Sequence, residues 1–165
     1  MNITDQKHER NVILAEMETE FDKHNISYFK KMIFNKDNVL RTRAVCILAE
    51  IGGSDAVEPI SEVLNNDNDD LVRHEAAFSL GQLGCKSAVT VLCNAVLNDK
   101  SFFVRHEAAV ALGVIGDENA RETLNNAFKE DESDEVKNSA IVALSNLDYI
   151  LYSKKYNQFT RLTGG

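Results

Sequence analysis

Two His-Glu dipeptides, His74-Glu75 and His106-Glu107, are the residues whose types and spacing could support chemistry. The two histidines are 32 residues apart. Imidazole and carboxylate groups together suit iron, manganese or zinc, so the pattern indicates metal binding. Adjacent residues on a helix project about 100° apart, so a single dipeptide is a poor chelator of one ion. Two histidines on neighbouring helices could instead share an ion, while the carboxylates reach a second ion or another protein surface.

The side chains at equivalent repeat positions on neighbouring helices form a row, here called the ladder, whose successive positions are its rungs. The four ligands of one ladder are too few to enclose a two-metal site, so a second copy of the chain would have to supply the remaining ligands. The alternative is that repeat duplication copied a neutral surface pair. A third dipeptide, His8-Glu9, lies outside the repeat and is interpreted as solvated surface. Gly81 and Gly113 follow the histidines on the same helical face. Glycine inside a helix costs about 1 kcal/mol relative to alanine, so we expect something to approach that face closely.

The dipeptides belong to a longer repeat with a period of 32 residues, which is typical of stacked supersecondary units. The aligned segments are 40–52, 72–84, 104–116 and, more weakly, 136–144. Their apolar residues recur at helical spacing, as at Val72, Ala76 and Leu80. The three stronger copies end at a glycine, where a left-handed C-cap would lie: Gly52, Gly84 and Gly116.

Another helix of about three turns is predicted before each motif, at 55–65, 87–98 and 118–129 for the last three copies. Acidic pairs in the connecting turns, such as Asp69-Asp70 and Asp131-Glu132, are interpreted as solvated charges. The prediction is an all-α solenoid of about four HEAT-like helical hairpins in one domain, 1–165. The expected parts are a capping helix (4–23), hairpins near 26–51, 54–83, 87–115 and 118–147, and a C-terminal tail (148–165), partly disordered from residue 153.

Composition narrows the class of protein. The chain has 165 residues, 44% of them hydrophobic, and a net charge of −8, so a nucleic-acid partner is not expected. No apolar run is long enough to cross a bilayer, and the first residues lack the apolar core of a signal peptide. The three cysteines fit packed, reduced thiols. We therefore expect a cytoplasmic protein without a membrane partner.

The repeated sequence motifs resemble those of the deoxyhypusine hydroxylase family, whose members are HEAT-repeat di-iron monooxygenases. The resemblance runs from about residue 41 to 147, and its most specific part is the motif HE-A-x-x-x-LG, present from His74 and again from His106. Generic HEAT proteins, including those similar to phycobilin lyases, share the frame but usually lack both His-Glu pairs. The family is built of two facing halves of four hairpins, and this chain resembles one half.

The resemblance implies an O₂-activating di-iron centre that hydroxylates a deoxyhypusine side chain on a translation factor. A head-to-head homodimer would supply the full ligand set and hold a pair of iron ions. By the resemblance, His74 and His106 bind one iron and Glu75 reaches the iron of the other subunit. Glu107 would be the catalytic residue beside the metal, orienting water or the substrate amine. The alternatives are a non-catalytic HEAT scaffold that binds a protein, or a metalloenzyme with another substrate.

Overall fold

The computed structural model describes residues 3–155, which contain α-helices and short 3₁₀ turns and no β-strand. The α-helices are α1 (Ile3–Asp22), α2 (Ile26–Met32), α3 (Asn38–Gly52), α4 (Val57–Asn66), α5 (Asp70–Leu83), α6 (Val89–Asn98), α7 (Phe102–Ile115), α8 (Arg121–Glu130) and α9 (Asp134–Lys155). The 3₁₀ turns are Gly53–Ala56, Lys86–Ala88 and Glu118–Ala120, each leading into the first helix of a hairpin. The expected all-α solenoid is confirmed.

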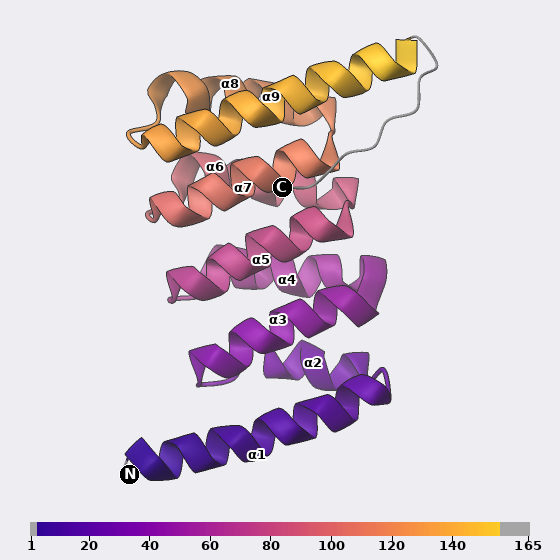
Figure 1. Ribbon diagram of the computed structural model, residues 1–165, viewed down its shortest axis with the longest axis vertical. Coiled ribbons are helices and arrows are strands. Elements are labelled where there is room, and N and C mark those ends of the chain that lie inside the picture. The colour runs from indigo at the N-terminus through magenta and orange to yellow at the C-terminus, as the bar shows by residue number, and fades with distance from the viewer. Residues whose placement is uncertain (1–2, 156–165) are drawn as a thin grey trace.

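The helices form two layers that rise along the length of the molecule. Helices α3, α5, α7 and α9 lie side by side in one layer, and α2, α4, α6 and α8 lie behind them (Figure 1). Helix α1 covers the N-terminal end of the stack and packs against α3. Within the described residues, no helix combines the length and apolarity needed to span a membrane.

The apolar stripe predicted from the repeat forms the interior between the two layers. Val72, Ala76 and Leu80 of α5 are all fully buried. Leu92 of α6 and Leu124 of α8 are fully buried from the other layer. Since each hairpin buries this stripe only against its neighbours, the stack is stabilised cooperatively along its length.

Helix α9 extends further than the sequence pattern predicts. It continues to Lys155, whereas the expected hairpin ended near residue 147. The fourth copy lacks the glycine that ends the other three, and Leu147, Ile150 and Ser153 are all buried along the extension. The part of the expected tail up to Lys155 is therefore helical, while residues 156–165 lie outside the described residues.

The glycine C-caps are confirmed in the second and third copies of the repeat, and in the first copy the cap is shifted by one residue. Gly84 and Gly116 take left-handed φ angles of 63° and 66°. In the first copy Gly52 stays right-handed with φ of −93°, and the following Gly53 takes the positive φ of 51°. Because two glycines are adjacent there, the helix runs one residue further before the chain turns.

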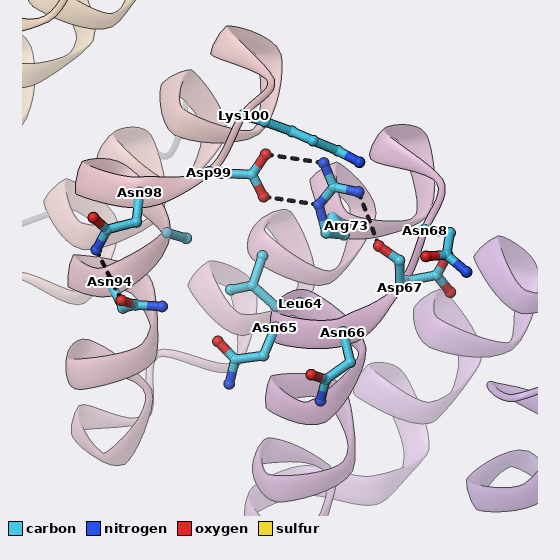
Figure 2. A pocket seen from close by; sticks show the side chains of 11 residues that line it. Leu64, Asn65, Asn66, Asp67, Asn68, Arg73, Asn94, Asn98, Asp99 and Lys100 are labelled. Carbon is cyan, nitrogen blue, oxygen red and sulfur yellow. Dashed lines mark hydrogen bonds and ion pairs between the residues drawn. The ribbon is translucent and has the colours of Figure 1, made fainter.

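Buried Arg–Asp pairs connect successive hairpins, and the sequence interpretation of acidic turns as solvated is wrong for Asp131. Arg73 donates from Nε and Nη2 to the two carboxylate oxygens of Asp99, at 2.7 and 2.9 Å, and from Nη1 to the Asp67 carbonyl (Figure 2). Arg105 repeats this arrangement with Asp131, whose side chain is only 7% exposed. Each arginine thereby ties its own helix to the turns of two hairpins, which sets the register of the stack.

Candidate metal centre

The fold places the four predicted ligands on two adjacent helices of one layer. His74 and Glu75 lie on α5, and His106 and Glu107 lie on α7. These helices pack side by side (Figure 1) because the repeat gives them the same buried stripe. The predicted ladder therefore exists as an arrangement of neighbouring helices.

The two in-phase glycines make this layer unusually tight. A Cβ atom added at Gly81 would lie 2.9 Å from Cβ and 3.0 Å from Cα of Ala111 on α7. At Gly113 it would lie 2.8 Å from Cα of Ala143 on α9. The close approach expected from the sequence is thus made by the next helix, with no need for a ligand there.

The contact between predicted ligands crosses from one helix to the next. His74 Nε2 lies 3.4 Å from Glu107 Oε2, and the two side chains are 19% and 12% exposed. The His74 ring also stacks on Phe103, with centroids 3.9 Å apart and planes 7° from parallel. His74 therefore faces the carboxylate of Glu107 on the next helix, and its ring lies flat against the ring of Phe103.

The other two predicted ligands contact residues that the sequence did not single out. His106 Nδ1 lies 2.7 Å from the hydroxyl of Ser139 on α9. Glu75 Oε1 accepts a hydrogen bond of 3.0 Å from the thiol of Cys46 on α3. Burial, helped by the bond to Glu75 and its charge, raises the pKa of the Cys46 thiol to about 12. The thiol is therefore protonated at neutral pH and acts as a donor that fixes the carboxylate.

The four predicted ligands do not converge on one point within a single chain. Among residues 3–155, no group of three or more histidine, cysteine, aspartate or glutamate side chains is placed to hold a metal ion. The structure brings together His74 and Glu107, while His106 and Glu75 are held by Ser139 and Cys46 respectively. Only two of the four predicted ligands thus contact each other within one chain.

The contacts present are compatible with an imidazole-carboxylate metal site. Two ligand atoms about 2.1 Å from one ion lie about 3.0–3.4 Å apart at octahedral to tetrahedral angles, which covers the His74–Glu107 spacing. His74 Nδ1 is buried and has no hydrogen-bond partner among the described residues. Stacking on Phe103 fixes the orientation of the His74 ring in the metal-free chain. The residues therefore fit iron, manganese or zinc as a partial donor set.

Sequence reasoning missed Phe103, Ser139 and Cys46. Ser139 occupies the position of Glu107 in the next copy, 32 residues on, so the repeat alignment could have identified it. Phe103 precedes His106 by three residues, and its ring covers the histidine of the preceding helix. Contacts of this kind join residue i to about residue i + 29 or i + 33, as for Cys46–Glu75 and His106–Ser139. The period of 32 points to the position of Ser139, but it does not reveal which residues are in contact.

Comparison with known proteins supports the architecture. The chain matches the family described as HEAT repeats over residues 57–145, and the PBS lyase HEAT-like repeat over residues 40–66. No curated protein sequence matches it significantly. The structure of human deoxyhypusine hydroxylase in complex with glycerol is similar, with a TM-score of 0.72 and 26% sequence identity. That similarity covers 92% of this chain and 51% of the hydroxylase, so the chain spans about half of its length.

The HEAT repeats match covers more than half of the 165 residues, and the layered hairpins agree with it. The chain therefore belongs to the HEAT repeat family.

Proposed function

We propose that the chain is an iron-dependent protein hydroxylase resembling deoxyhypusine hydroxylase, with a di-iron site assembled from the His-Glu pairs of two subunits. The observation that carries the proposal is the 3.4 Å contact between His74 and Glu107 in a chain whose fold is similar to one half of that enzyme. A second, facing copy would complete a donor set that one chain offers only in part.

In this proposal His74 and His106 supply imidazole ligands, and Glu75 supplies a carboxylate to the iron of the facing subunit. Iron bound there would supply O₂ activation. Phe103 keeps the His74 ring in a fixed plane, and the Cys46 thiol holds Glu75. Glu107, beside His74, orients water or the substrate amine. The same carboxylate lies at ligand spacing from His74, so it could also enter the coordination sphere.

The substrate class follows from charge and from the similarity together. The chain carries a net charge of −8, which favours a basic, amine-bearing protein segment. A deoxyhypusine side chain on a translation factor is such a segment, and we propose it as the substrate. A reduced thiol set and this substrate both fit action in the cytoplasm.

Metal content measured on matched variants tests the proposal. Protein expressed with ample iron should retain about one iron per chain, and His74→Ala and His106→Ala should each lose most of it. His8→Ala is the matched control, because His8 is also followed by glutamate but is exposed on α1, outside the ladder. Equal metal content in all four proteins would contradict the proposal.

A second candidate function is a scaffold that binds a partner protein, and one surface feature favours it. A mostly apolar hollow between α3 and α5 is lined by Ala49, Phe78 and Leu83, and Phe78 is 41% exposed. Exposed aromatic side chains often mark protein-binding faces. For a scaffold, Phe78→Ala should weaken a partner complex while His106→Ala leaves metal content unchanged. For the hydroxylase, His106→Ala should remove metal.

A further inference from the structure

The hydroxyl of Ser139 lies within hydrogen-bond distance of two groups, which compete for its single proton. Ser139 is buried on α9 with 7% of its surface exposed. Its Oγ donates to the Glu135 carbonyl at 2.9 Å and lies 2.7 Å from His106 Nδ1 on α7. A hydroxyl has a single proton, and a carbonyl oxygen can only accept. The bond to the Glu135 carbonyl forms only if the Ser139 proton is donated to it, and the geometry fits that bond.

In that arrangement the contact with His106 runs in the opposite direction. With its proton donated elsewhere, Ser139 Oγ is an acceptor, so His106 Nδ1 carries the hydrogen and donates it. A neutral imidazole has only one N–H, which leaves the lone pair on Nε2. In metalloproteins a second hydrogen bond of this kind fixes the tautomer and orientation of a ligating histidine.

The repeat shows that this arrangement is specific to the last rung. The positions equivalent to Ser139 are Arg43, Glu75 and Glu107. His74, one rung earlier, faces Glu107 through Nε2, and its Nδ1 has no hydrogen-bond partner among residues 3–155. A small hydroxyl in place of a carboxylate therefore reverses which ring nitrogen is engaged by the next helix.

We infer that Ser139 is a positioning residue that fixes His106 as the Nδ1–H tautomer and so presents the Nε2 lone pair as a metal ligand. The tautomer part of the inference stands on hydrogen bonds within this chain, and the metal part rests on the proposed function. The two parts have separate measurements, so either can fail without the other.

The tautomer is measured first, on the full chain without metal. Long-range ¹H–¹⁵N NMR at a pH where the histidines are neutral should show His106 Nδ1 as protonated and Nε2 as unprotonated. Ser139→Ala should shift His106 toward the Nε2–H form, whereas Ser139→Thr keeps a hydroxyl and should preserve the wild-type pattern. Ser145→Ala is the matched control, because exposed Ser145 bonds to the Ile141 carbonyl four residues earlier in the same way. An Nε2–H tautomer in the wild type, or no change in Ser139→Ala, would overturn the inference.

Cobalt(II) binding to the same variants measures the metal part. Ser139→Ala should weaken Co²⁺ binding about 10- to 100-fold, the usual effect of removing such a partner. Ser139→Thr and Ser145→Ala should bind as the wild type does. Unchanged affinity in Ser139→Ala would refute the metal role of Ser139. Absence of Co²⁺ binding in the wild type would refute the proposed function and the metal part together, while the NMR result would still decide the tautomer.

Discussion

Replacing Gly113 by alanine tests whether the in-phase glycines serve helix packing. The new Cβ atom would lie 2.8 Å from Cα and 2.9 Å from Cβ of Ala143 on α9. A Cβ atom almost never comes within 3.0 Å of a heavy atom from another part of the chain. Because the closest atom belongs to the backbone, no rotation of a side chain can relieve the overlap, and α7 and α9 must separate.

The magnitude follows from two opposing effects. Overpacking a tight interface typically costs about 1–3 kcal/mol, and a backbone obstacle favours the upper part, about 2–3 kcal/mol. Alanine in place of glycine inside a helix returns about 1 kcal/mol. We therefore expect Gly113→Ala to lower the free energy of unfolding by about 1–2 kcal/mol, which corresponds to a Tm about 2–8 °C lower for a chain of this size.

Urea unfolding followed by circular dichroism measures this change. Ser145→Ala serves as a control for helix propensity alone, because Ser145 is exposed on α9, and it should be neutral or slightly stabilising. If Gly113 existed only to let a ligand approach the surface, alanine would stabilise the ligand-free chain by about 1 kcal/mol. Stabilisation of that size would refute the packing explanation.

Three further predictions concern buried polar contacts. Asp131→Asn leaves Arg105 without its carboxylate partner, so unfolding free energy should fall by about 3 kcal/mol, whereas Asp148→Asn at an exposed pair should cost about 0–1 kcal/mol in the same urea assay. Burial alone would raise the pKa of Asp131, but the hydrogen bonds from Arg105 and the Ser133 amide outweigh it and lower the pKa. Stability from this group is thus present above the pKa of an unfolded aspartate and lost as pH falls through the lower folded value, so acid unfolding should be shallower in Asp131→Asn. The pKa of Cys46 is about 12, so alkylation of its thiol by iodoacetamide should be slow and should still accelerate from pH 8 to 10. Glu75→Gln removes a charge that raises this pKa, so it should speed the alkylation at a given pH. Mass spectrometry of the labelled peptide measures the rate.

The solenoid could be predicted because its information is periodic. Apolar spacing within each copy gives the helices, and the recurrence of the copies gives their stacking. The capping glycines at 84 and 116 follow from the need for a left-handed residue at each helix end. The end of α9 could not be read in this way, because its boundary depends on burial of Ile150 and Ser153 against the stack and no local stop signal marks it.

The ligand types and their helices could also be predicted, but the partners of each ligand could not. Periodicity places His74 and His106 on adjacent helices, yet the contacts are out of phase with the period of 32, by one residue for His74–Glu107 and by three for Cys46–Glu75. The sideways offset between packed helices decides which residues face each other, and it depends on close contacts across the interface such as Gly81 against Ala111. The hydroxyl of Ser139 is a similar case, because its role depends on the residue across the interface.

Native mass spectrometry of the iron-replete protein tests the central claim most directly, because it reads oligomeric state and metal content on the same particle. The proposal predicts a dimer that carries about two iron ions, together with iron-free monomer when the dimer dissociates. A monomer without metal, from protein expressed and purified with iron present, would contradict a site shared between subunits.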